Sequence, residues 1–130
     1  MIQGMNHFTI LTDNLDATRS FYCDLLGLKE GYRPSVGVPG LWLYAGDQAI
    51  LHVVERNPLP EPRSGVLDHI AFTATDLSAT LQLLDRHGTD FRLMRQADSG
   101  IWQVFIFDPN KVKLELDFAS TEQAPSVTET

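Results

Sequence analysis

Four side chains that can bind a divalent metal occur at matching positions in two parts of the chain. His7 and His69 each lie in a segment with the pattern of a β-strand, and His52 and Glu115 each lie in a later segment of the same kind. A carboxylate with imidazoles is a ligand set for Fe²⁺, Zn²⁺, Ni²⁺ or Mn²⁺. If these groups were left unpaired in one cleft, their burial would cost free energy, and a bound ion offsets that cost. The sequence predicts a metal site of His7, His69 and Glu115, with His52 as a fourth member.

An internal repeat relates these four residues. Residues 5–10 match residues 67–72, and the same offset carries residues 15–18 onto 77–80. Residues 49–53 match residues 112–116 at an offset one residue longer, which makes His52 and Glu115 equivalent. Side chains alternate across a strand, so the apolar neighbours of His52 and Glu115 face away from them. We expect the four polar groups to share the concave face of a curved sheet.

Each repeat is predicted to fold as βαβββ. Helices are expected to begin at Asp13-Asn14 and at Asp76, whose side chains accept hydrogen bonds from free amide groups, and to end at Gly27 and Gly88. After the helices, strands are predicted at residues 28–33, 41–45, 49–55, 91–95, 102–107 and 112–118. The predicted fold class is α+β, with two βαβββ modules in tandem that form an open, curved mixed sheet around a metal cleft.

The modules are predicted to span residues 5–56 and 67–118 of a single domain that covers residues 1–130. Between them, residues 57–65 contain three prolines, which fix φ and remove amide donors, so this segment is expected to be an extended linker. Residues 119–130 are expected to form a flexible tail. A chain of 130 residues is long enough to bury a core without disulfides or metals as staples.

Composition argues against several classes of partner. The net charge is −7 and the basic residues are scattered, which disfavours nucleic acid. No apolar run approaches the length of a membrane-spanning helix, and no secretory leader is recognisable. With the single Cys23, these features predict a cytoplasmic protein without membrane partners. Motifs for nucleotide binding and for serine-elbow hydrolysis are absent from the sequence.

The chain resembles the vicinal oxygen chelate superfamily, which includes glyoxalase I, extradiol dioxygenases and the fosfomycin and bleomycin resistance proteins. The resemblance spans nearly the whole chain and is carried by residues 6–8, 21–28, 68–72, 107–110 and 114–116. It implies an open barrel around a divalent ion, a small-molecule substrate and a homodimer. It also places His7, His69 and Glu115 on the metal ligands of the family.

The resemblance leaves the role of His52 open between metal ligand and general acid or base. At the corresponding position glyoxalase I has a ligating Glu, whereas ring-cleaving dioxygenases have an acid/base His near the metal. Two histidines and a carboxylate are typical of Fe(II) oxygenases. We therefore favour an Fe²⁺ extradiol-type dioxygenase acting on a small vicinally oxygenated compound, with His52 and Glu115 as catalytic residues. Phe105 argues against it, because dioxygenases of the family carry a Tyr there.

Two other functions are alternatives to the dioxygenase. The first is a lyase or isomerase like glyoxalase I, using Zn²⁺, Ni²⁺ or Mn²⁺, and the second is a non-catalytic binding protein like those of bleomycin resistance.

Other conspicuous side chains have simpler interpretations. His87 is expected to stabilise a helix end, Cys23 to be inert, and the arginines to be mostly solvated, although they could orient an anionic substrate. The core is the expected place of the aromatic residues of the central strands, Trp42, Tyr44, Trp102 and Phe105.

Overall fold

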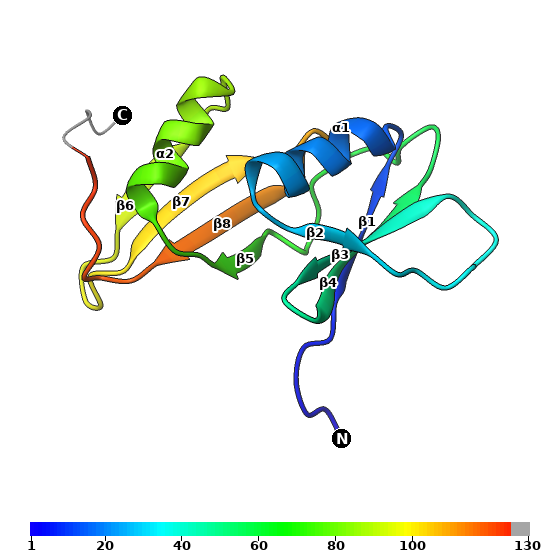
Figure 1. The fold of residues 1–130 in the computed structure, drawn as a ribbon, viewed down its shortest axis with the longest axis horizontal. Helices are drawn as coiled ribbons and strands as arrows, with labels where there is room; N and C mark the ends of the chain where they lie inside the picture. The colour runs from blue at the N-terminus through cyan, green and yellow to red at the C-terminus, as the bar shows by residue number, and fades with distance from the viewer. Residues whose placement is uncertain (126–130) are drawn as a thin grey trace. The chain divides into compact units, whose positions relative to one another are not determined.

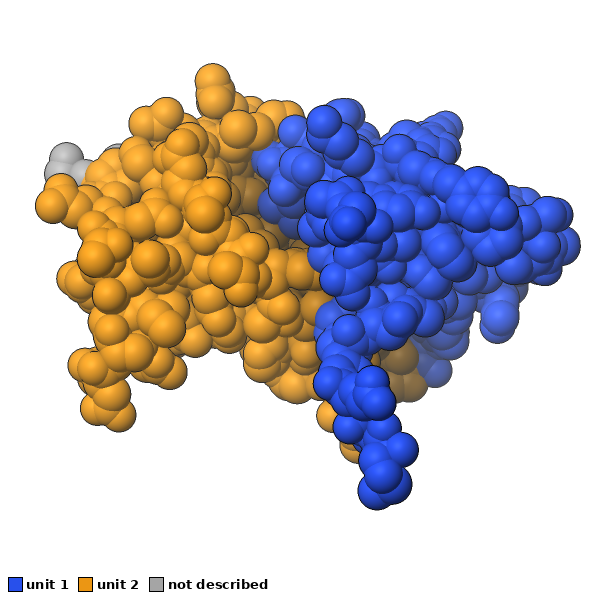
Figure 2. All heavy atoms as spheres, turned by 60° about the horizontal axis from the view of Figure 1, so that its bottom comes forward, with its two compact units in different colours: residues 1–61 blue, residues 62–130 orange. Residues whose placement is uncertain are grey.

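The computed structural model describes residues 1–125, which divide into two compact units. Unit 1 is Met1–Glu61, and unit 2 begins at Pro62 (Figure 2). The boundary falls within the proline-rich segment, residues 57–65, that was expected to link the two modules. No helix in this part of the chain could cross a lipid bilayer.

Each unit has the predicted βαβββ order and forms a four-stranded mixed sheet (Figure 1). In both sheets the first strand pairs in parallel with the last, and the other pairs are antiparallel. Unit 1 has the sheet order β1-β4-β3-β2 and contains β1 (Phe8–Thr12), α1 (Leu15–Arg19), η1 (Ser20–Leu25), β2 (Lys29–Gly31), β3 (Gly40–Ala45) and β4 (Gln48–Glu55). Unit 2 has the order β5-β8-β7-β6 and contains β5 (Ile70–Thr73), α2 (Leu77–Arg86), β6 (Arg92–Arg95), β7 (Trp102–Phe107) and β8 (Lys113–Phe118). The predicted α+β class with tandem βαβββ modules is confirmed.

The first helix has two parts, which the sequence did not predict. Asn14 begins α1, where its side chain accepts from the Ala17 amide at 3.0 Å, and Gly27 follows the helix with a φ of +84°. Between them, η1 is a π-helical turn that contains the fully buried Tyr22. The apolar spacing at positions 21, 22, 25 and 26 does not distinguish an α-helix from a π-helix, so the wider turn could not be recognised.

Alternation along the central strands separates a core face from an open face in each sheet. The core face carries side chains that are almost fully buried, namely Leu41, Leu43, Leu51 and Val53 in unit 1 and Val104, Ile106, Leu114 and Leu116 in unit 2. Burying each contributes about 1.5–3 kcal/mol. A shift of one residue would turn these side chains to the open face, so the core fixes the register of His52 and Glu115.

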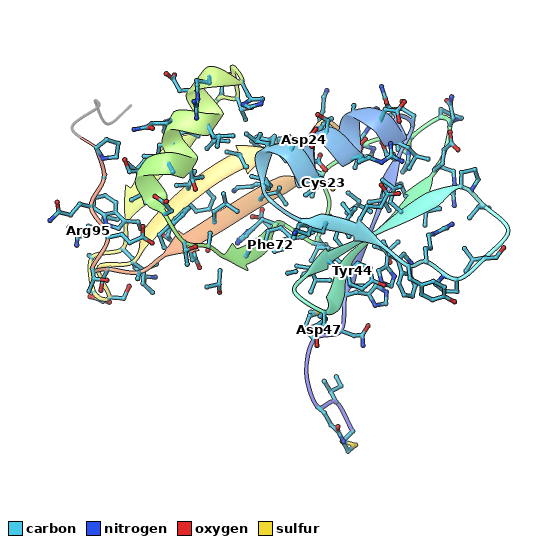
Figure 3. The ribbon with its side chains drawn as sticks, viewed as in Figure 1. Cys23, Asp24, Tyr44, Asp47, Phe72 and Arg95 are labelled. Atoms are coloured by element: carbon cyan, nitrogen blue, oxygen red, sulfur yellow. The ribbon has the colours of Figure 1, made fainter. Side chains whose placement is uncertain are left out.

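The segment after β8 is held against unit 2 through Glu122. Its carboxylate accepts from the Leu77 amide at 2.7 Å, at the start of α2, and its backbone oxygen accepts from the Trp102 indole at 2.8 Å. Arg95, labelled in Figure 3, donates to the Ser120 oxygen at 3.1 Å. Of the tail expected to be flexible, Ser120 and Glu122 therefore have defined partners in unit 2, and residues 126–130 lie outside the described residues.

Candidate functional site

In unit 1, His52 lies between two other rings on the open face of the sheet. His52 on β4 is paired with Thr9 of β1 on one side and with Trp42 of β3 on the other. Its ring is stacked on His7, with centroids 3.7 Å apart and an interplanar angle of 14°. On the opposite face it is stacked on Trp42 at 3.9 Å and 11°. Both faces of the imidazole are covered, so only its edge nitrogens can react.

The environment of His52 favours the neutral imidazole. Burial lowers the pKa of His52 below its ordinary value, and the charges of His7 and Arg33 lower it further, while a hydrogen bond with the Ala49 backbone opposes the change. A neutral imidazole retains one lone pair, and it can accept a proton or bind a metal. His52 is therefore in the form that either of its predicted roles requires.

The stacking restricts how His7 and His52 can share an ion. A metal bound to an imidazole nitrogen lies close to the ring plane, about 2.0–2.1 Å from the nitrogen. Two nearly parallel rings whose centroids are 3.7 Å apart have no common position of that kind. In this arrangement one of the two histidines can be a ligand, and the other can only lie next to the ion.

Both predicted ligand histidines have Nδ1 engaged by the preceding residue. His7 Nδ1 lies 2.7 Å from the amide oxygen of Asn6, and His69 Nδ1 lies 2.8 Å from a carboxylate oxygen of Asp68. Because these oxygens accept, Nδ1 must carry the hydrogen and the neutral ring keeps its lone pair on Nε2. Hydrogen bonds of this kind orient ligand histidines in metal sites. The repeat thus supplies one oriented Nε2 donor atom in each unit.

In unit 2, His69 and Glu115 lie together. Glu115 on β8 is paired with Ala71 of β5, and its carboxylate oxygen lies 3.5 Å from His69 Nε2. The Glu115 side chain is 11% exposed and that of His69 is 35% exposed. A carboxylate oxygen and an unprotonated imidazole nitrogen are both electron-pair donors, so the space between them favours a cation. This pair fits a divalent ion.

Asp117 is a functional candidate that the sequence reading missed. It lies two residues after Glu115 on the same face of β8, and strand alternation was the signal that could have identified it. Burial, followed by a hydrogen bond and charge repulsion from Glu115, raises the pKa of Asp117 to about 6. Its Oδ1 is shielded from solvent and has no hydrogen-bond partner among residues 1–125. Two carboxyl groups so arranged require a shared proton or a nearby cation.

The pKa of Asp117 predicts how the stability of the metal-free protein depends on pH. The folded-state pKa of about 6 lies above the ordinary value of 3.8 for this carboxyl group, so the folded protein binds this proton more tightly. Stability is therefore greatest below the lower value and falls as pH rises through the higher one. Asp117→Asn is expected to remove this dependence on pH. Above the folded-state pKa of about 6, the substitution should raise the free energy of unfolding by about 1–2 kcal/mol, allowing for partial solvent screening.

Urea denaturation of chelator-treated protein, carried out below pH 3.8 and above pH 6, measures the effect. The matched control is Asp47→Asn in the exposed turn between β3 and β4, which should follow the parent protein at every pH. If the free energies of unfolding of the parent protein and of Asp117→Asn change with pH in parallel over this range, the raised pKa of Asp117 is contradicted.

A groove in unit 2 lies on the same face of the sheet as Glu115. It has a volume of about 360 Å³, and its lining includes Arg92, Phe105, Phe107 and Lys113. Phe105 is paired with Glu115 across β7 and β8, and the Lys113 ammonium lies 5.5 Å from the Phe105 ring centre. Trp42 and Phe105, which were expected in the core, both lie on the open faces, because they alternate with the buried residues of their strands.

The surroundings of Cys23 and His87 agree with their simpler interpretations, whereas Arg95 is held by protein groups and is not a freely solvated charge. Burial raises the pKa of Cys23 on η1, which disfavours the reactive thiolate; Figure 3 labels Cys23 beside Asp24. His87 ends α2, and its ring nitrogen contacts the Leu83 carbonyl at 2.9 Å. Arg95 lies over the Trp102 ring at 4.5 Å.

The predicted ligands occur as two pairs, His7 with His52 in unit 1 and His69 with Glu115 in unit 2. Across residues 1–125, no three His, Cys, Asp or Glu side chains are close enough together to hold an ion. Each pair by itself offers fewer protein ligands than the three or four of a typical transition-metal site.

Comparison with known proteins agrees with the fold. The chain is 29% identical over 123 residues to the glutathione transferase FosA of Serratia marcescens, covering 92% of this chain and 84% of that protein. It is 24% identical over 122 residues to glyoxylase I 4 of Arabidopsis thaliana, covering 88% and 70%. A glyoxalase family protein of Bacillus anthracis has the same fold, with a TM-score of 0.75 at 20% identity over 92% of this chain and 97% of that chain.

A family model covers most of the chain. Residues 4–116 match the model of the Glyoxalase/Bleomycin resistance protein/Dioxygenase superfamily. The match includes both modules and all four predicted ligands, and members of this superfamily are often metal-dependent enzymes that act on small molecules. The chain belongs to the Glyoxalase/Bleomycin resistance protein/Dioxygenase superfamily.

Proposed function

We propose that the chain is a divalent-metal-dependent enzyme in which His7, His69 and Glu115 hold the ion. The observation that carries this proposal is the 3.5 Å approach of His69 Nε2 to the Glu115 carboxylate, with His69 Nδ1 oriented by Asp68. His7, oriented in the same way by Asn6, is the third ligand. A bound ion supplies the positive charge that holds two neighbouring oxygens of a small substrate.

His52 acts as a general acid or base in this proposal. The stack with His7 argues against both rings binding one ion, and burial together with nearby positive charge keeps the imidazole neutral. A neutral histidine next to the substrate can take up a proton and return it. Covered faces leave the ring edge free for proton transfer while Trp42 and His7 fix its orientation.

The reaction we favour is dioxygenation of a small vicinally oxygenated compound, aromatic or not, with Fe²⁺ as the resident ion. Two histidines, one carboxylate and a separate acid/base histidine support this choice. The groove lined by Phe105 and Phe107 offers apolar surface of suitable size for a small ring.

A lyase or isomerase of the glyoxalase I type is the second candidate. Phe105 favours it, because this side chain has no hydroxyl group to contact an aromatic substrate. The likeness to glyoxylase I 4 points in the same direction. In this reaction Zn²⁺ or Ni²⁺ would replace Fe²⁺, and His52 or Glu115 would transfer the proton between adjacent carbon atoms.

Elemental analysis of protein purified without oxygen separates these candidates, together with two assays. We expect one divalent ion per chain. Oxygen uptake with catechols after Fe²⁺ loading supports dioxygenation, whereas isomerisation of a hemithioacetal with Zn²⁺ or Ni²⁺ supports the second candidate. Protein that binds no divalent ion, and whose His7→Ala/His69→Ala variant behaves like the parent, contradicts the proposed metal enzyme.

A further inference from the structure

Arg33 lies on the open face of unit 1, close to His52. Gly40 is two residues before Trp42 on β3, so both positions face the same side of the sheet. A Cβ at Gly40 would lie closest to the Val53 backbone oxygen, and it would be 2.7 Å from Arg33 Nη2 and 2.9 Å from Cζ. The Val53 carbonyl and the Arg33 guanidinium together therefore occupy the space that a side chain at position 40 would fill. Gly40 is paired with Val54, two residues after His52 on β4.

The Nε–H group of Arg33 has no protein partner among residues 1–125. Its nitrogen is shielded from solvent, so water does not satisfy this donor either. A buried donor without an acceptor is rare in proteins and costs stability. The other guanidinium donors, on the two Nη groups of this half-buried side chain, are not shielded in this way, so these are the donors that an external acceptor can reach.

The backbone next to Arg33 is fixed in place. The Tyr44 hydroxyl donates to the carbonyl of Tyr32 at 2.6 Å, immediately before Arg33 in the chain. The Tyr44 ring also packs on Gly31, where an added Cβ would be 2.6 Å from the ring. Figure 3 labels Tyr44. Arg33 therefore starts from an ordered position, which reduces the entropy lost when a ligand binds.

We infer that Arg33 binds an oxyanion of the substrate, a carboxylate or a phosphonate, on the open face of unit 1. This inference rests on the proposed function, because it assigns a substrate class to the same site. A planar guanidinium binds such groups through two parallel hydrogen bonds, which a lysine cannot do. The half-buried Trp42, between Gly40 and the His52 stack, offers apolar surface to the rest of the molecule. The substrate would thus combine neighbouring oxygens with an anionic group.

Binding of simple aryl probes to the full chain after removal of metal tests the inference without requiring turnover. Benzoate and phenylphosphonate are compared with neutral benzamide at constant ionic strength, by calorimetry and by the NMR signal of the Arg33 Nε–H group. We expect at least one anion to bind and to shift this signal, and benzamide to bind at least tenfold more weakly. The anion that binds more tightly identifies the oxyanion.

Two variants and a control complete the test. Arg33→Gln should reduce anion affinity about tenfold or more, and Arg33→Lys should retain intermediate affinity. Arg56→Gln, at an exposed arginine of the same unit, should bind like the parent. Equal binding of benzoate, phenylphosphonate and benzamide, or an unshifted Arg33 signal in the parent protein, overturns the inference. Because the assay contains no metal, the anion site can stand if the metal enzyme fails, and the metal enzyme can stand if the anion site fails.

Discussion

Glu115→Gln is expected to abolish stoichiometric binding of a divalent ion and to lower activity by at least a hundredfold. The amide retains the shape of the side chain but removes the negative charge that faces His69 Nε2. A neutral oxygen is a much weaker ligand for a transition-metal ion. Elemental analysis after dialysis, together with calorimetric titration of Fe²⁺ and Zn²⁺, measures the loss.

Folding of this variant can be checked independently. Removing the charge of Glu115 relieves its repulsion with Asp117, so the metal-free variant should be at least as stable as the metal-free parent near neutral pH. The control is Glu55→Gln, at an exposed carboxylate at the end of β4, which should retain the ion. A folded Glu115→Gln protein that still holds one ion per chain would remove Glu115 from the site.

His52→Gln is expected to lower kcat about 10²- to 10⁴-fold while metal content remains unchanged. Glutamine cannot carry a proton near neutral pH, and general acid–base catalysis contributes about this factor. For the parent protein, the acidic limb of the pH profile should lie below the ordinary histidine pKa, because burial lowers the pKa of His52. Steady-state rates across pH, with metal analysis of each sample, measure both effects.

The same experiment decides the role of His52. If metal content falls together with the rate, His52 is a ligand and the stack with His7 must rearrange when the ion binds. A variant with full activity and a full metal content would exclude both roles. His87→Gln, at the exposed end of α2, is the control and should leave rate and metal content unchanged.

The elements of this fold were predictable from sequence because each has a local cause. Capping by Asn14 and Asp76 and positive φ at Gly27 and Gly88 define the helix ends. Alternation of buried residues defines the strands. The strands after the helices begin and end within two residues of the predictions, whereas β1 and β5 begin one residue after His7 and His69, which were expected to lie within them. The π-helical turn of η1, which contains the buried Tyr22, was not predictable, because the apolar spacing of this segment fits an α-helix equally well.

The candidate site was predictable in its residue types and not in its detailed geometry. The repeat brings His52 and Glu115 onto equivalent strands, and register pairs them with Trp42 and Phe105. The stack of three rings depends on side-chain rotamers, which a one-dimensional pattern does not contain. The position of the Arg33 guanidinium likewise depends on the three-dimensional shape of the loop between β2 and β3, and on the absence of a side chain at Gly40.

The adjacent carboxyl groups of Glu115 and Asp117 have a consequence for the lifetime of the protein. Their repulsion weakens the chain when no cation is present, and any ligand that binds only the folded state stabilises it. Copies without an ion would unfold more often and be degraded by proteases sooner than loaded copies. The same two side chains would in this way couple the abundance of the protein to the supply of its ion.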